Sequence, residues 1–205
     1  MSLIEILIQG GWLMIFIAAA SIVVIALGIS RFIALRRESD QLSKFLLEWN
    51  DVPATVDQSK YISACQMGPN SVFEMATSLR RYKYSRKEAA DKIESVARTE
   101  LSQLETGLGT IATLASATPL LGFLGTVTGM IRAFMQIQNL GGNVNANVLA
   151  GGIWEALVTT AAGLAVGIVA LIIHNYLAVR VKKVAGQLES VGEITLRILR
   201  SNNEG

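Results

Sequence analysis

Three long apolar runs constrain this 205-residue chain more than any other feature of its sequence. Residues 6–30 and residues 106–131 contain no charged side chain, and residues 147–179 are interrupted only by Glu155 and His174. A helix needs about 20 apolar residues to cross a hydrocarbon core about 30 Å thick, and each run exceeds that length. The sequence therefore predicts an all-α integral membrane protein with three transmembrane helices.

The first run has one alternative interpretation, a cleaved signal peptide. The residues before it include Glu5 but no Lys or Arg, and the run is longer than the roughly 7–15 apolar residues of a signal peptide. Composition agrees with a membrane protein, since 51% of the residues are hydrophobic and only 17% are charged. We therefore expect a transmembrane helix within residues 1–35.

The charged side chains are confined to two segments. Residues 31–105 hold 12 Lys and Arg with 11 Asp and Glu, and residues 180–205 hold five and three, so that 31 of 34 charges lie there. With three crossings, both segments lie on the same side of the membrane. Basic residues flank the spans on that side, which makes it cytoplasmic by the positive-inside tendency. These are Arg31, Arg36, Arg37, Arg180, Lys182 and Lys183.

The polar segment between the first two spans is expected to be helical. Ser85 and Glu88 have the spacing of a capping box, and Ser71 and Glu74 form a second possible one. The helix that starts at Ser85 is expected to run unbroken into the second span, because no Gly or Pro intervenes before Gly107. The expected organisation is a first transmembrane helix in 1–35 with a periplasmic N-terminus, a cytoplasmic helical segment in 36–105, a second transmembrane helix in 106–137, a periplasmic loop in 138–150, a third transmembrane helix in 151–179 and a cytoplasmic C-terminal helix in 180–205.

The residue types that most enzymes use are scarce. The single cysteine, Cys65, has no partner for a disulfide or a metal site and is expected to pack as a small apolar side chain. The glycines of "GFLGTVTG" lie inside an apolar run and not between a strand and a helix, so the context of a phosphate-binding loop is missing. The sequence predicts no catalytic residue, no metal, no cofactor and no nucleic-acid partner.

Small residues recur at helical spacing in the second and third runs, and this predicts one small face on each helix. Such faces let helices in lipid approach closely, so tight helix packing is the simplest interpretation. Gly125 with Gly129, and Gly163 with Gly167, also have GxxxG spacing. The two faces are Ala115, Pro119, Gly122, Thr126, Gly129 and Ala133, and Gly152, Ala156, Thr160, Gly163, Gly167 and Ala170.

Thr126, Thr159 and Thr160 place hydroxyls at membrane depth in these runs, and Glu155 places a carboxylate there. Threonine hydroxyls can bond to a carbonyl one turn back, and a carboxylate is favoured near a helix N-terminus, so all four could be structural. Ionisable groups in spans commonly face an interior or an aqueous cavity, where they mark ion or proton pathways. The residues alone leave packing and conduction open.

Two segments carry a resemblance to a known family. "TPLLGFLGTVTGMIRAF" (118–134) and "GGIWEALVTTAAGLAVGIVALIIHNYL" (151–177) resemble the signature of the MotA/TolQ/ExbB proton-channel family. The likeness covers all three spans in order, and the three-span length favours the ExbB/TolQ branch. It implies a homo-oligomeric ring of five subunits in the lipid bilayer. The pore, lined by the second and third spans, would enclose a single-span ExbD/TolR-type partner whose aspartate carries protons, and a TonB/TolA-type protein would be coupled to it.

The resemblance also assigns residues. Thr126 matches the family's pore threonine in the second span, Glu155 its glutamate in the third, and Thr160 its third-span pore threonine. Thr159 adds a hydroxyl where relatives often have alanine. The implied function is a proton-conducting motor subunit of the bacterial inner membrane, which energises outer-membrane transport or envelope maintenance with protons as the coupling ion. A passive membrane scaffold for the partner and the same motor serving motility are the alternatives, and the choice between ExbB and TolQ stays open.

Overall fold

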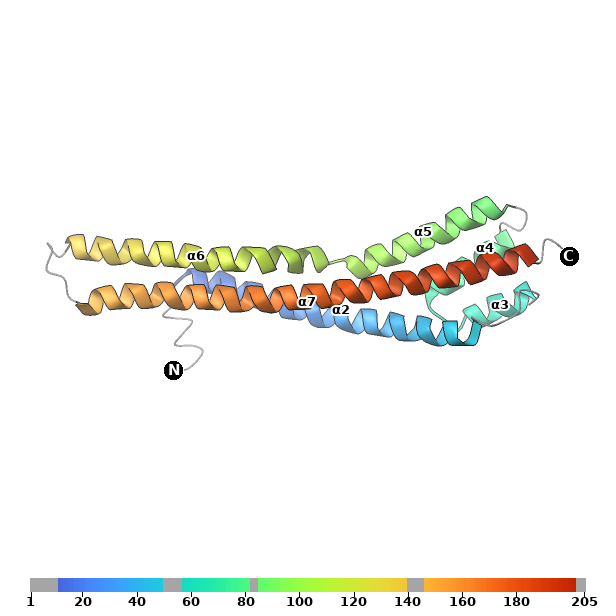
Figure 1. Cartoon of the computed structure of the whole chain (residues 1–205), viewed down its shortest axis with the longest axis horizontal. Helices are drawn as coiled ribbons and strands as arrows, with labels where there is room; N and C mark the ends of the chain where they lie inside the picture. The colour runs from blue at the N-terminus through green and yellow to red at the C-terminus, as the bar shows by residue number, and fades with distance from the viewer. Residues whose placement is uncertain (1–10, 50–56, 82–84, 140–145, 202–205) are drawn as a thin grey trace. The chain divides into compact units, whose positions relative to one another are not determined.

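Every regular element that the structure, a computed structural model, describes is an α-helix, which confirms the predicted class (Figure 1). The described residues are 11–49, 57–81, 85–139 and 146–201. Three helical stretches, Leu13–Trp49, Arg86–Asn139 and Ala150–Ser201, are long and apolar enough to cross a membrane. The helices are α2 (Leu13–Trp49), α3 (Gln58–Cys65), α4 (Asn70–Arg81), α5 (Arg86–Glu105), α6 (Leu108–Asn139) and α7 (Ala146–Ser201).

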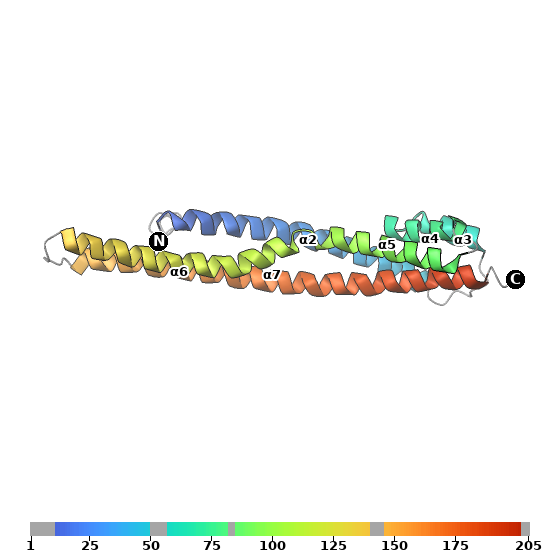
Figure 2. The same cartoon turned by 90° about the horizontal axis from the view of Figure 1, so that it is seen from above.

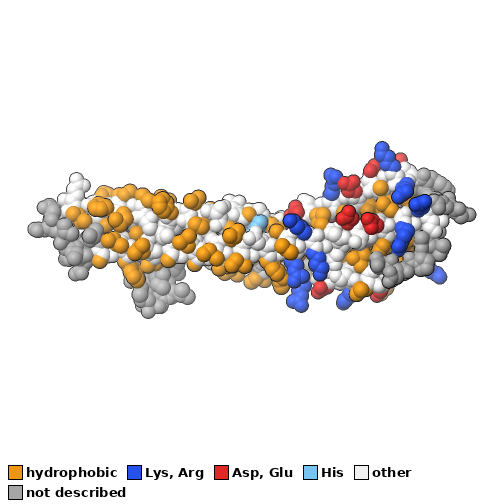
Figure 3. Space-filling view, viewed as in Figure 1, with side chains coloured by type: hydrophobic (Ala, Val, Ile, Leu, Met, Phe, Trp, Pro, Cys, Tyr) orange, Lys and Arg blue, Asp and Glu red, His pale blue; other side chains and the backbone are white. Residues whose placement is uncertain are grey.

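The chain divides into two compact units. The membrane unit comprises Met1–Ile29 and Gly107–Tyr176, and the polar unit comprises Ser30–Thr106 and Leu177–Gly205. This division follows the charges, because 31 of the 34 charged residues belong to the polar unit. On the face drawn in Figure 3, hydrophobic side chains cover the membrane unit, whereas acidic and basic side chains gather over the polar unit.

Large apolar side chains point outward over the membrane unit. On α6, which runs beside α7 in both views (Figures 1 and 2), Phe123 is 65% exposed and Phe134 is 60% exposed. Ile168 and Ile172 of α7 are similarly exposed. A continuous apolar surface of this kind is unfavourable in water and favourable in hydrocarbon. The membrane unit therefore has the surface of an integral membrane protein.

Pro119 lies inside α6 without ending it. Proline has no N–H, so the carbonyl of Ala115 lacks its usual helical donor and the ring crowds the preceding turn. Both features face Gly167 of α7: a methyl group on Gly167 would lie 2.7 Å from Cγ of Pro119 and 3.1 Å from the Ala115 carbonyl oxygen. The missing side chain at Gly167 thus leaves room for the proline, so that α6 continues beside α7.

The expectation of one unbroken helix from Ser85 into the second span is wrong, because the chain turns at Thr106 and Gly107. Thr106 has φ −54° and ψ 127°, and Gly107 has φ 86°. These angles match the two central positions of a type II turn, the second of which requires a positive φ and therefore favours glycine. The Thr106 N–H donates to the Gln103 carbonyl at 3.3 Å, and the Ile111 N–H donates to the Gly107 carbonyl at 3.1 Å in α6.

The polar unit is built around large buried side chains. The Tyr61 ring lies 5.0 Å from that of Trp49 between centroids and 6.1 Å from that of Phe45. Its hydroxyl shares a hydrogen bond with Thr195 Oγ1 of α7 at 2.9 Å. Cys65 lies one turn further along α3 and is fully buried, which raises the pKa of its thiol to about 12 and confirms its packing role. The same core holds Leu35, Leu42, Met75, Leu79, Leu188 and Ile198, and α4 packs against both α3 and α5.

The two possible capping boxes have different outcomes. Ser85 is the N-cap of α5, and its hydroxyl accepts a hydrogen bond from the Glu88 N–H at 3.3 Å, as expected. Ser71 is not a cap, because α4 already begins at Asn70. Its hydroxyl instead donates to Glu38 Oε1 of α2 at 3.3 Å. At Ser71 a tertiary partner replaces the local cap that the spacing predicts.

Candidate functional site: the contact between α6 and α7

The two small faces lie against each other within one chain. A side chain on Gly167 would meet Pro119, one on Gly163 would meet the Thr118 carbonyl, and one on Gly129 would meet Ala156. Positions that rise along α6 therefore face positions that fall along α7, so the helices pack antiparallel. The expectation that these faces also meet neighbouring copies in a ring stays a prediction.

The contact brings backbone close to backbone. A methyl group on Gly122 would lie 3.1 Å from the Thr159 carbonyl oxygen and 3.1 Å from Cα of Thr160. One on Gly129 would lie 3.0 Å from Cβ of Ala156 and 3.2 Å from the Gly152 carbonyl oxygen. Larger side chains at these positions require the helices to move apart. The glycines thus set the separation of α6 and α7.

Thr160 links the two helices directly. Its Oγ1 donates a hydrogen bond to the Gly122 carbonyl oxygen of α6 at 2.8 Å. Gly122 is where the backbones approach closely enough for a short side chain to span the gap. One of the predicted pore hydroxyls is therefore part of the helix contact in the single chain.

Thr126 and Thr159 bond within their own helices. Thr126 Oγ1 donates to the Phe123 carbonyl at 2.6 Å, and Thr159 Oγ1 donates to the Glu155 carbonyl at 2.7 Å. Thr159 is buried, with its Cβ and methyl group packed where a side chain on Gly125 would lie. Thr126 is only partly buried. Each hydroxyl hydrogen is engaged by these bonds.

A further buried hydroxyl, that of Thr118, was missed by the sequence reasoning. The Thr118 hydroxyl donates to the Leu114 carbonyl at 2.9 Å. The backbone carbonyl oxygen of Thr118 is the atom that a methyl group on Gly163 would approach most closely. Thr118 is fully buried. The signal was available, because Thr118 follows Ala115 by three residues and precedes Gly122 by four.

Glu155 is paired with Arg132. Nη1 of Arg132 lies 2.7 Å from Oε1 of Glu155, with 25% of the glutamate side chain and 45% of the arginine side chain exposed. In the sequence, Arg132 is one of the three charged residues, with Glu5 and Glu155, that lie outside the two polar segments. Arg132 directly follows the second run, and Glu155 is the only carboxylate of the third run, which was the signal that could have paired them.

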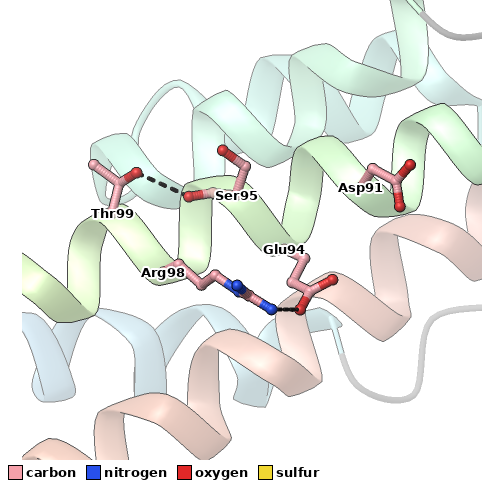
Figure 4. A pocket seen from close by; sticks show the side chains of 5 residues that line it. All are labelled: Asp91, Glu94, Ser95, Arg98 and Thr99. Atoms are coloured by element: carbon pink, nitrogen blue, oxygen red, sulfur yellow. Dashed lines mark hydrogen bonds and ion pairs between the residues drawn. The ribbon is translucent and has the colours of Figure 1, made fainter.

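The other candidate sites are weak. The depression shown in Figure 4 is lined by Asp91, Glu94, Ser95, Arg98 and Thr99, all from α5, and Glu94 forms an ion pair there with Arg98. A surface made by one helix face has no second wall to enclose a ligand. Among the described residues, no three His, Cys, Asp or Glu side chains come together as a metal site.

Comparison with known proteins identifies the family. The family model described as "MotA/TolQ/ExbB proton channel family" matches residues 69–190, which include all of α6 and most of α7. The chain belongs to the MotA/TolQ/ExbB proton channel family. Thr126, Glu155 and Thr160 all lie inside the matched segment, and so does Arg132.

Relatives named ExbB and TolQ confirm the predicted branch of the MotA/TolQ/ExbB family. The chain is 34% identical over 124 residues to a biopolymer transport protein ExbB homolog of Methanothermobacter thermautotrophicus, covering 59% of this chain and 43% of the relative. It is 33% identical over 110 residues to ExbB of Pseudomonas putida (54% and 32%) and 38% identical over 85 residues to the Tol-Pal system protein TolQ of Haemophilus influenzae (42% and 37%). The chain thus spans less than half the length of these relatives.

Proposed function

We propose that this chain is a proton-conducting motor subunit of the ExbB/TolQ type, which assembles as a ring in a bacterial inner membrane. The observation that carries the proposal is the geometry of α6 and α7. These antiparallel helices hold Thr126, Glu155 and Thr160 on one closely packed pair, inside the segment that matches a proton channel family. Threonine hydroxyls in an otherwise apolar wall are groups that can exchange hydrogen bonds with a proton carrier.

The proposed partners are those that the resemblance to the family implies. We propose five copies around one pore, a single-span ExbD/TolR-type protein inside it, and a TonB/TolA-type protein coupled to that partner. The relatives' names, which refer to biopolymer transport and to the Tol-Pal system, support a role in outer-membrane transport or envelope maintenance. Protons on the partner's carboxyl group are the proposed coupling ion, and no cofactor is needed.

The hydrogen bonds of the two pore threonines define how they would handle a carboxyl group. A protonated carboxyl can donate its O–H to Thr126 or Thr160 without disturbing either hydroxyl, because both oxygens retain lone pairs. A charged carboxylate only accepts, so the hydroxyl must rotate away from the Phe123 or Gly122 carbonyl that it now bonds. One intrachain hydrogen bond is then exchanged for a charge-assisted one, which is stronger.

The orientation is part of the proposal. Residues 36–105 and 180–205 would be cytoplasmic, and the N-terminus and residues 138–150 would be periplasmic. Native Cys65 is a poor probe because it is fully buried. In a Cys65→Ala background, Met67→Cys, at a position that is 93% exposed, should react with an impermeant maleimide only after the membrane is opened, whereas Asn143→Cys should react from outside. External labelling at position 67 contradicts the orientation.

The rival function is a passive scaffold that only anchors the partner. It predicts that the hydroxyls of Thr126 and Thr160 matter for packing alone. The test is proton flux into liposomes that hold the chain with the single-span protein co-purified with it, under an imposed potential. Thr→Val keeps the shape and removes only the hydroxyl.

The double variant Thr126→Val with Thr160→Val should slow proton flux at least several-fold while the complex stays assembled. An unpaired buried polar group costs about 1–3 kcal/mol, and about 1.4 kcal/mol corresponds to a factor of ten. Glu155→Gln should impair flux less than this double variant. Thr113→Val is the matched control, because Thr113 is an exposed α6 threonine bonded to the Gly109 carbonyl at 2.9 Å. If the double variant conducts like the parent, the scaffold is correct.

A further inference from the structure

The ion pair between Arg132 and Glu155 lies well inside the two helices. Arg132 precedes the end of α6 by seven residues and Glu155 follows the start of α7 by nine, which correspond to about 10 Å and about 14 Å of helix. Within the described part of the membrane unit, these two side chains are the only ones from Asp, Glu, Lys or Arg. Each is therefore the other's only counter-charge there.

A third segment of the chain, at Gly11, contacts the same carboxylate. A methyl group on Gly11 would overlap Oε1 of Glu155 and would lie 3.6 Å from Nη1 of Arg132. Gly11 has φ 68°, and its carbonyl accepts a hydrogen bond from the Met14 N–H at 3.1 Å in the turn that leads into α2. Both its backbone angle and the space around it exclude a side chain. The turn that leads into α2 thus packs directly on the ion pair.

We propose that Arg132 is the positioning residue of Glu155, and that the pair is a fixed clasp that joins α6 and α7 to the turn before α2. In this role Glu155 remains a paired charge throughout transport and does not itself carry protons. The inference rests on the proposed function, because it specifies what one residue of that ion pathway does. It goes further because it gives structural roles to Arg132 and Gly11, to which the resemblance assigns none.

Physical chemistry favours a fixed pair over a proton carrier. A single charge at membrane depth is costly, and an opposite charge within hydrogen-bond distance offsets that cost. Protonation of Glu155 would break the pair and leave the arginine charge without its partner at membrane depth, where a lone charge is costly. A transport cycle that protonates Glu155 would incur this free-energy cost in each cycle.

The experiment is a double-mutant cycle in the complex with its co-purified partner. Arg132→Gln and Glu155→Gln should each slow proton flux by about threefold or more, because each leaves one charge unpaired. The double variant Arg132→Gln with Glu155→Gln removes both charges and should return to within about twofold of the parent. If the double variant is as slow as Glu155→Gln alone, Glu155 acts independently of Arg132 and the proposal fails. It also fails if Arg132→Gln conducts like the parent.

Two further measurements separate positioning from general stability. Arg132→Lys keeps the charge and should retain most of the flux, whereas Arg132→Met keeps the length and should behave like Arg132→Gln. Infrared spectra of samples with isotope-labelled glutamate should show a protonated carboxyl band in Arg132→Gln that is absent from the parent and from the double variant. An unchanged spectrum overturns the proposal even if a variant assembles poorly.

Gly11 supplies an independent test. Gly11→Ala should displace the carboxylate and lower both the flux and the thermal midpoint of the complex. The control is Gly151→Ala in α7, where an added methyl group has nothing within 4 Å. Equal behaviour of the two variants overturns the assignment of Gly11. A parent complex that conducts no protons instead refutes the proposed function, and the thermal midpoints of the Arg132 and Glu155 cycle still test the clasp.

Discussion

Helices pack together differently in the membrane unit and in the polar unit. In the membrane unit, α6 and α7 meet through glycines, with Gly122 and Gly129 close to the backbone of the opposite helix. In the polar unit, helices are held apart by large side chains such as Tyr61, Leu42 and Leu188, which are almost completely buried. One chain therefore contains both a backbone-to-backbone contact and a side-chain core.

The difference follows from the solvent that each unit meets. In water, burying a leucine or tyrosine removes apolar surface from water and stabilises the fold, so a core of large side chains forms. In lipid that gain is absent, because the acyl chains are as apolar as the side chains. Close approach, dispersion and hydrogen bonds such as that from Thr160 to Gly122 then hold the helices together. Large apolar side chains of the membrane unit are accordingly free to face outward.

The largest expected effect is in the side-chain core. Leu42→Ala should lower the free energy of unfolding of the polar unit by about 2–5 kcal/mol, since Leu42 is fully buried. Leu47→Ala, at a site on the same helix that is 84% exposed, should change it by less than about 0.5 kcal/mol. Urea unfolding followed by Trp49 fluorescence, with Trp12 and Trp154 replaced by Phe, measures both. Equal effects would mean that this unit has no such core.

The next effect tests the backbone contact. Gly129→Leu should destabilise the α6–α7 pair by about 1–3 kcal/mol or more, because the added atoms meet Ala156 and the Gly152 carbonyl. Native mass spectrometry should show smaller particles, while membrane insertion persists. Gly109→Leu in the same helix is the control, since a methyl group there has nothing within 4 Å. An intact complex of normal stability with Gly129→Leu would remove the contrast between the units.

Much of this contrast could be predicted from the sequence. The lengths of the charge-free runs predicted three membrane-spanning helices, and the spacing of small residues predicted one small face on α6 and one on α7. The turn at Gly107 was missed, because helical periodicity on both sides conceals a single residue with a positive φ. Ser71 was misassigned because its partner, Glu38, is 33 residues away and no local pattern reveals it.

The candidate site was only partly accessible to sequence reasoning. Thr126, Glu155 and Thr160 could be picked out by residue type and by resemblance. That Thr160 bonds across to Gly122 depends on the register between two helices, which spacing within each helix does not determine. The contact of Gly11 with Glu155 depends on a third element more than 140 residues away in the chain, and only the structure brings it there.

A smaller effect is expected from the hydrogen bond that links α3 and α7 in the polar unit. Tyr61→Phe should cost about 1 kcal/mol, because Thr195 loses its bond to the tyrosine but keeps the one it donates to the Val191 carbonyl at 2.8 Å. The double variant with Thr195→Val should cost less than the sum of the two single variants. Urea unfolding of all four proteins measures this coupling. Strict additivity would mean that the two hydroxyls do not depend on each other.

The smallest expected effect on stability comes from carboxyl groups of the polar unit whose pKa values are shifted by folding. Burial, followed by the neighbouring Glu100, raises the pKa of Glu38 above its ordinary value of 4.5, while the Ser71 hydroxyl and Arg37 lower it. Burial and the charge of Glu74 likewise raise the pKa of Glu100. A carboxyl group whose pKa is raised by folding binds its proton more tightly in the folded state. Its contribution to stability therefore declines as pH rises from 4.5 through the folded pKa.

Glu38→Gln should consequently raise the thermal midpoint near neutral pH, and the gain should vanish below pH 4.5. The effect should stay below about 1 kcal/mol, because Glu38 is partly solvated and water screens its charge.

Asp57→Asn is the control of opposite sign. Hydrogen bonds from Ser59 lower the pKa of Asp57, so its charge contributes stability above its ordinary value of 3.8 that is lost as pH falls. Thermal scans across pH should therefore show Glu38→Gln above the parent and Asp57→Asn below it at neutral pH, with both differences disappearing in acid. A Glu38→Gln protein that is less stable than its parent at neutral pH would contradict this prediction. It would mean that the hydrogen bond between Glu38 of α2 and Ser71 of α4 stabilises the unit more than the burial of Glu38 and its repulsion from Glu100 destabilise it.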